Sequence, residues 1–184
     1  MKKIFFAGLI FILCSFINII QFDIKTVRLD KTKSSITYKM SHPMHNWEGV
    51  TKDVDGAVQF DDKTGKIVKV AVVAKIASFD SKNSNRDSHM LEVTEAIKYP
   101  TVSFVSTAVK DEGAVIDVTG NIIFHNVTKQ IHFTAASVTE NKNRTVTGNF
   151  VVLLEDFKLE RPSLMMVKTD NEMRMSFSVA FPEN

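Results

Sequence analysis

The sequence has a single cysteine, Cys14, among its 184 residues. Cys14 lies in an apolar N-terminal segment, so the rest of the chain can form no internal disulfide. Stability must therefore come from a packed core, even in an oxidising compartment. A chain of this length with an apolar fraction of 44% is large enough for one domain with such a core.

The sequence also lacks an excess of charge of either sign. It contains 23 lysine and arginine residues and 21 aspartate and glutamate residues, and Lys2 and Lys3 belong to the N-terminal segment. Removing those two leaves 21 basic residues against 21 acidic ones. This balance argues against a nucleic-acid partner, which would be held by neutralising phosphates.

Motifs of several common enzyme classes are absent from the sequence. It has no G-x-S-x-G, P-loop or G-x-G-x-x-G pattern. Adjacent acids such as Asp61-Asp62 and Glu155-Asp156 occupy positions expected of turns and strand ends rather than of acid–base pairs. We therefore expect a protein that is not an enzyme, with no catalytic residue, no metal and no cofactor.

The N-terminus resembles a secretory signal. Two lysines precede an apolar run from Ile4 to Ile20. We predict that residues 1–21 form a signal peptide that directs the chain to the periplasm or out of the cell. The alternative is an uncleaved membrane anchor through residues 4–20. Leu13 argues against acylation of Cys14, because lipoprotein processing requires a small residue at that position.

From residue 24 onward, the hydrophobic pattern repeats every two residues, which is typical of β strands. In residues 172–181 the alternating apolar residues are Met173, Met175, Phe177, Val179 and Phe181. Residues 114–124 and 131–135 predict a hairpin. Further strands are predicted at residues 25–29, 35–41, 53–61, 66–78, 101–110 and 144–154. These segments indicate one all-β domain over residues 24–183, either an antiparallel barrel or a sandwich.

One helical insertion is predicted around residues 84–98. Ser84 and Asp87 have the spacing of a capping box, and Tyr99-Pro100 ends the segment. One face of this helix should pack against the sheet, and it carries Met90, Val93 and Ile97.

Two groups of polar and aromatic residues are candidates for a site. His42, His45 and Trp47 come within six residues, and Pro43 predicts a loop or an irregular strand end there. These side chains could line a pocket, bind a metal or pack in a loop, although their spacing matches no recognised metal motif.

The second group is Arg86, Asp87 and His89. Arginine presents a planar fork of donors that suits a phosphate or a carboxylate at a cavity mouth. In the structural alternative, Asp87 caps the helix, Arg86 pairs with a carboxylate and His89 bonds to backbone. The residues leave both alternatives open.

Several segments together resemble the YceI-like family of bacterial polyisoprenoid-binding proteins. They are SITYKMSH (35–42), ASFDSKNSNRDSHM (77–90), KYPTVSF (98–104), GNIIFHNVTKQIHF (120–133) and EDFKLERPS (155–163). The resemblance runs from about residue 26 to residue 181. It implies an extended, lipocalin-like antiparallel barrel of eight strands that encloses an isoprenoid or a similar amphiphile, in a protein that is exported.

Two segments depart from the family pattern. Residues 154–158, LEDFK, retain the Asp and Phe of a common R-x-D-F-G run but have neither its Arg nor its Gly. The segment PMHNW after His42 replaces a commoner stretch that contains glycine. Both departures fall near predicted strand ends, so they concern the ligand's head group rather than the fold.

The resemblance implies a non-enzymatic carrier of an isoprenoid, quinone or fatty-acid-like lipid. Transient membrane contact and a homodimer are further expectations. The predicted lipid-binding residues are His42, His45, Trp47, Arg86, His89, Phe104, Phe124, Phe133, Phe150 and Phe177. For the phenylalanines, ordinary core packing is the alternative. The alternative functions are a metal- or His-dependent enzyme acting on a bound lipid, and a stress-related interaction module with a packed barrel.

Overall fold

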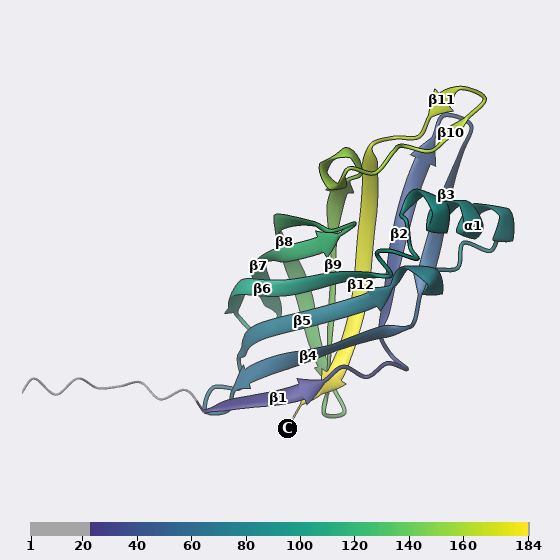
Figure 1. Ribbon diagram of the computed structural model, residues 1–184. Coiled ribbons are helices and arrows are strands. Elements are labelled where there is room, and N and C mark those ends of the chain that lie inside the picture. The colour runs from purple at the N-terminus through teal and green to yellow at the C-terminus, as the bar shows by residue number, and fades with distance from the viewer. Residues whose placement is uncertain (1–22, 184) are drawn as a thin grey trace, which may run out of the picture.

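The computed structural model describes residues 23–183, so the predicted signal peptide or anchor lies outside the described residues. Most of the described chain forms one antiparallel sheet, as the two-residue period predicts (Figure 1). Its strands are β1 (Ile24–Arg28), β2 (Ser35–His42), β3 (His45–Thr51), β4 (Val54–Asp61), β5 (Ile67–Lys75), β6 (Thr101–Asp111), β7 (Val115–Phe124), β8 (Val127–Glu140), β9 (Asn143–Leu153) and β12 (Glu172–Pro182). A separate hairpin consists of β10 (Ser163–Leu164) and β11 (Val167–Lys168).

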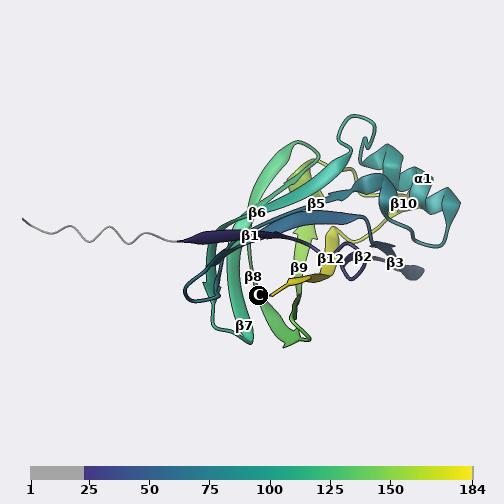
Figure 2. The ribbon, with the colours of Figure 1, turned by 90° about the horizontal axis from the view of Figure 1, so that it is seen from below.

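The strand order is β1-β4-β5-β6-β7-β8-β9-β12-β2-β3, and the sheet curls into a half-barrel (Figure 2). This confirms the predicted all-β antiparallel barrel class, with ten strands in the main sheet rather than eight. The prediction of a loop or irregular strand end over residues 42–47 was wrong for residues 45–47, which begin strand β3. Pro43 and Met44 form only a two-residue turn, and β3 then pairs along β2 down to Thr51.

The two outer strands, β1 and β3, are tied back to the rest of the barrel. The N–H of Asp30, just after β1, donates to the carbonyl of Ala180 on β12 at 2.7 Å. Val50 on β3 exchanges two backbone hydrogen bonds of 3.0 Å with Asp80, which follows β5. These bonds satisfy backbone groups at edges that could otherwise pair with other chains.

The helix α1 (Ser84–Val93) lies over one end of the barrel, and two short 3₁₀ turns, η1 (Ile76–Ser78) and η2 (Glu155–Phe157), flank strand ends (Figure 1). The prediction of Ser84 as the N-cap was wrong by one residue. The side chain of Asn83 accepts the N–H of Arg86 at 3.1 Å and is the N-cap. The carboxylate of Asp87 instead accepts the N–H of Ser81, so it fastens the segment that precedes the helix.

The helix also ends earlier than predicted. Residues 94–98 form turns, so Ile97 does not continue the face of Met90 and Val93. Ile97 is instead fully exposed to solvent. The three-and-four spacing therefore predicted the inner face of α1 correctly for its first two members only.

The buried side chains form two clusters along the barrel. The closed-end core lies at the end that carries β1 and includes Leu29, Val54, Val58, Phe60, Ile67, Ile116, Val118, Ala135, Val146, Val179 and Phe181. The α1-end cluster includes Tyr38, Met40, Ala74, Ile76, Phe79, Ile122, Phe124, Val152, Leu154, Phe157, Leu159 and Met175. Several strands contribute to both clusters, because their inward residues recur every second position.

A buried ion pair lies beside the closed-end core. Arg144 donates from Nη2 to the Asp111 carboxylate at 2.8 Å and from Nε to the Ser137 hydroxyl at 2.7 Å. Burial raises the pKa of Asp111, but hydrogen bonds from Arg144 and from the N–H groups of Ile67 and Gly113 outweigh it, so the pKa lies below its usual value. The pair therefore joins β6 to β9 through charged groups that are almost fully buried.

Candidate functional site

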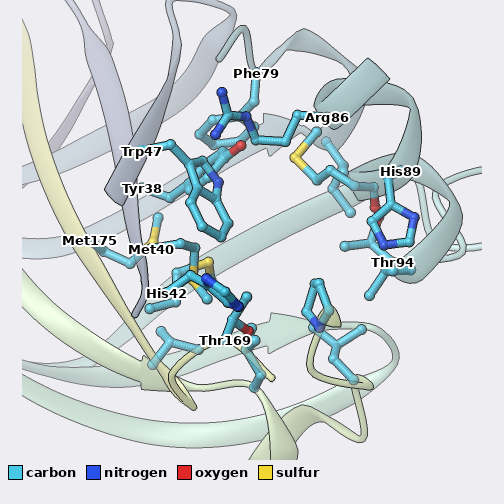
Figure 3. A pocket seen from close by; sticks show the side chains of 18 of the residues that line it. Tyr38, Met40, His42, Trp47, Phe79, Arg86, His89, Thr94, Thr169 and Met175 are labelled. Atoms are coloured by element: carbon cyan, nitrogen blue, oxygen red, sulfur yellow. The ribbon is translucent and has the colours of Figure 1, made fainter. Parts of the chain in front are cut away.

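A cavity of about 590 Å³ lies within the α1-end cluster (Figure 3). Its wall is largely apolar because every second residue of the surrounding strands faces inward. The buried apolar residues that line it are Tyr38, Met40, Ile76, Phe79, Ile122, Phe124, Val152, Leu154, Leu159 and Met175. The volume is in the range of sites that hold small ligands.

Two segments from distant parts of the chain complete the lining. Residues 83–94, which include α1, contribute Arg86, His89 and Met90 on one side. The residues that flank the β10–β11 hairpin contribute Pro162 and Thr169 on another. In Figure 3, His89 lies across the cavity from Tyr38 and Met175, so the helix forms one wall and the strands the opposite one.

His42 connects the end of β2 to the β10–β11 hairpin. Its Nδ1 accepts the N–H of Met44 at 3.2 Å, so the proton belongs on Nε2, which lies 3.1 Å from the carbonyl oxygen of Val167. The residue is buried, and both of its ring nitrogens are engaged. His42 therefore positions the hairpin at the cavity.

A row of rings runs from His42 along the wall. The ring centroids of His42 and His45 are 5.7 Å apart, and those of His45 and Trp47 are 5.2 Å apart. The guanidinium carbon of Arg86 lies 5.2 Å from the centroid of the Trp47 ring, a cation–π arrangement, and Arg86 Nε donates to the Ser81 hydroxyl. Arg86 is thus held over Trp47 by these two contacts, and not by the carboxylate of the structural alternative.

Tyr38 packs beside this row, with its ring 5.6 Å from that of Phe79. Burial raises the pKa of its hydroxyl above the usual value, and the nearby Asp87 carboxylate adds to this effect. Gly49, which pairs with Tyr38 across β2 and β3, leaves room for the ring, because a Cβ there would overlap it. Tyr38 therefore presents a neutral, largely apolar side chain to the cavity.

Thr169 is the unusual polar group of the lining. It is 3% exposed, and among the described residues its Oγ1 has no hydrogen-bond partner. Its backbone is held firmly, since its carbonyl accepts from Arg161 Nε at 2.9 Å and its N–H donates to Pro162 at 2.8 Å. A buried hydroxyl without a partner costs roughly 1–3 kcal/mol, which a polar ligand atom could recover.

Six of the ten predicted site residues line this cavity: His42, His45, Trp47, Arg86, His89 and Phe124. His45 and His89 are exposed at its rim, and His89 Nδ1 lies 3.6 Å from a carboxylate oxygen of Glu92 rather than bonding to backbone. The other four, Phe104, Phe133, Phe150 and Phe177, are not part of the lining and pack against one another.

Sequence reasoning missed much of the wall, notably Tyr38, Met40, Met173, Met175 and Thr169. The strand residues among them share the inward phase of β2 or β12, so alternation marks them as inward-facing. Alternation carries no signal for Thr169, which lies outside a strand.

Within residues 23–183, no three His, Cys, Asp or Glu side chains are grouped so that they could hold a metal ion. In the same residues, no helix is long and apolar enough to cross a membrane.

The curled antiparallel sheet and the cavity at one of its ends define a lipocalin-like β-barrel protein. The model of the YceI-like domain matches residues 28–181, and the chain therefore belongs to the YceI-like family. This agrees with the resemblance found in the sequence.

Known relatives support this assignment. Protein YceI of Salmonella newport (strain SL254) is 35% identical over 99 residues, which span about half of each chain (52%). The crystal structure of Burkholderia cenocepacia BcnA has a TM-score of 0.73 at 19% identity and covers 83% of this chain and 98% of its own. A polyisoprenoid binding domain from Saccharophagus degradans has a TM-score of 0.70 at 13% identity, with 86% and 98% coverage. At these identities the two structures show a shared fold.

Proposed function

We propose that this chain binds and carries one amphiphilic lipid, an isoprenoid or a similar single-chain molecule, without converting it chemically. The observation that carries the proposal is a largely apolar cavity of about 590 Å³ whose lining includes one buried hydroxyl, on Thr169, without a partner among the described residues. An apolar tail would fill the cavity, and an oxygen of the head group would satisfy Thr169.

Apolar contact can supply most of the affinity. Each buried methylene contributes roughly 0.8 kcal/mol, so about fifteen carbons contribute on the order of 12 kcal/mol. Association costs roughly 4–15 kcal/mol, so the apolar contribution alone offsets most or all of that cost. The rim residues Arg86 and His89 would then select the head group more than they strengthen binding.

The fold relative from Saccharophagus degradans, which is described as a polyisoprenoid binding domain, supports this choice of ligand class. A role without chemistry is supported by the state of His42, whose two ring nitrogens are both engaged by backbone groups. A histidine held in this way is poorly placed to act as a general base or as a metal ligand.

We further propose that the protein is exported through residues 1–21 and collects its ligand at a membrane surface. The turn between β2 and β3 and the β10–β11 hairpin are joined through His42 and Val167. Both tips expose large apolar side chains, namely Met44, Met165, Met166 and Val167. Apolar tips beside a lipid cavity suit contact with the bilayer from which the lipid would come.

Native mass spectrometry of protein purified from its own host tests the main proposal. We expect a bound mass that matches one lipid per chain and that disappears after delipidation. Trp47 is the only tryptophan in the chain and lies in the cavity wall, so its fluorescence should change when farnesol is added back. A protein that is purified without lipid and shows no response to farnesol or to palmitate would refute the binding function.

A further inference from the structure

Four half-buried phenylalanines pack against one another in the barrel interior. Phe133 is at its centre, with ring centroids 5.6 Å from Phe104, 5.5 Å from Phe150 and 5.4 Å from Phe177. The ring centroids of Phe150 and Phe177 are also near each other, 6.4 Å apart. We refer to Phe104, Phe133, Phe150 and Phe177 as the aromatic partition.

The aromatic partition lies directly below the cavity. Three of its members are two positions along a strand from residues of the cavity lining, so each is the next inward residue, roughly 7 Å further along the barrel. These pairs are Val102 and Phe104, Val152 and Phe150, and Met175 and Phe177. Phe104 packs against both buried clusters, which places the partition between the cavity and the closed-end core.

Two glycines make room for the rings. A Cβ on Gly120 would overlap the Phe104 ring, and a Cβ on Gly148 would lie 2.7 Å from Cζ of Phe177. Both glycines are in strand interiors, where glycine weakens a strand and often marks the close approach of another group. The rings therefore lie across the interior at the positions where two strands have no side chain.

We infer that the aromatic partition closes the barrel interior directly behind the cavity lining and so sets an upper limit on ligand length. This inference rests on the proposed lipid-binding function and specifies its substrate class. If a methylene takes about the volume of a liquid water, roughly 30 Å³, a cavity of about 590 Å³ holds on the order of 20 carbons. The ligand class is thus a single-chain lipid of about that length, and chains of twice that length do not fit.

The test is a competition among prenyl alcohols of increasing length. Delipidated protein is incubated with vesicles that contain equal amounts of farnesol, geranylgeraniol and octaprenol, and native mass spectrometry identifies the bound species. Each methylene that remains outside the cavity is transferred from the bilayer to water, which lowers the affinity roughly fourfold. The wild-type protein should therefore favour geranylgeraniol over octaprenol by at least about a hundredfold.

Two variants should change the maximum ligand length in opposite directions. Phe133→Ala removes the central ring and should raise the bound ratio of octaprenol to geranylgeraniol by at least about tenfold. Phe60→Ala is the matched control, because it removes a ring of the closed-end core and should leave the ratio unchanged. Val152→Phe places a ring one layer nearer the mouth and should shift selection from geranylgeraniol to farnesol. Thermal unfolding of each variant shows whether it is folded.

The outcomes distinguish a failure of the length limit from a failure of the lipid-binding function. Octaprenol bound by the wild-type protein as well as geranylgeraniol would overturn the length limit and leave the lipid-binding function in place. The same holds for a Val152→Phe protein that is folded and still prefers geranylgeraniol. A wild-type protein that binds no prenyl alcohol of any length would overturn both the length limit and the proposed function.

Discussion

Replacement of Thr169 by valine should make the free protein more stable. Valine has nearly the shape of threonine but lacks the hydroxyl, and the Thr169 Oγ1 is buried with no partner among the described residues. Removing a buried hydroxyl without a partner should recover roughly 1–3 kcal/mol. For a chain of 184 residues, each kcal/mol raises the melting temperature by about 2–4 °C.

The same substitution should weaken the binding of a lipid that carries a hydroxyl or a carboxyl group. A hydrogen bond to Thr169 would contribute about 0.5–1.5 kcal/mol net, which corresponds to a loss of roughly two- to twelvefold in affinity. The parent hydrocarbon of farnesol, which has no oxygen, should bind the variant at least as well as the wild type. The opposite changes in stability and affinity distinguish a ligand contact from a structural defect.

Scanning calorimetry of the delipidated proteins measures the first effect, and titrations followed by Trp47 fluorescence measure the second. A Thr169→Ser variant is the control, because it keeps the hydroxyl and removes only a methyl group. The reasoning fails if Thr169→Val lowers the melting temperature, since the hydroxyl would then have a partner in the free protein. It also fails if farnesol and its parent hydrocarbon lose affinity equally.

Three further predictions concern other parts of the barrel. Lys158 has a φ of 58°, a left-handed conformation that favours glycine, and many family members have glycine at this position. Lys158→Gly should therefore raise the free energy of unfolding, measured by urea titration, by up to about 1 kcal/mol. Lys158→Ala should not raise it. Arg144→Met leaves the buried Asp111 carboxylate without its charged partner and should lower the free energy of unfolding by about 3–5 kcal/mol near pH 7. Because the pKa of Asp111 is lowered in the folded wild type, the stability that this carboxylate contributes is present above about pH 4 and is lost as the pH falls below it. In urea titrations, the difference in free energy of unfolding between the wild type and the variant should therefore become smaller in acid. A difference that does not change with pH would contradict this. Replacing Met165 and Met166 together by serine should reduce co-sedimentation with vesicles while farnesol binding is kept, whereas Val138→Ser, an exposed change at the far end of β8, should alter neither.

The fold class could be predicted because its signal is local. Alternation in residues 172–181 places Met173, Met175, Phe177, Val179 and Phe181 on one face of β12, and the structure has them in that order along one strand. The same period identified the β7–β8 hairpin. The wrong predictions were also local. The N-cap is Asn83 rather than Ser84. The segment after Pro43 forms strand β3, because a two-residue turn accommodates the proline.

The division of the barrel interior could not be predicted from these local patterns. Phe124, Phe150 and Phe177 share the apolar phase of their strands, yet only Phe124 lines the cavity. The difference depends on how far along the barrel axis each residue lies, and this is set by the register of neighbouring strands such as β9 and β12. Register also aligns the gaps left by Gly120 and Gly148 with the rings that fill them.

Two-residue alternation in the sequence is thus sufficient for an antiparallel all-β domain and for the inner face of each strand, because both follow from the geometry of one extended chain. The choice of a barrel over a sandwich came from the family resemblance. The cavity, the aromatic partition behind it and the lone hydroxyl of Thr169 follow from long-range packing. They arise where α1 and the β10–β11 hairpin meet the end of a sheet whose inward residues are already aligned in layers. A local pattern does not encode which residues from different strands share a layer, so the length and polarity of the ligand site are properties of the folded barrel.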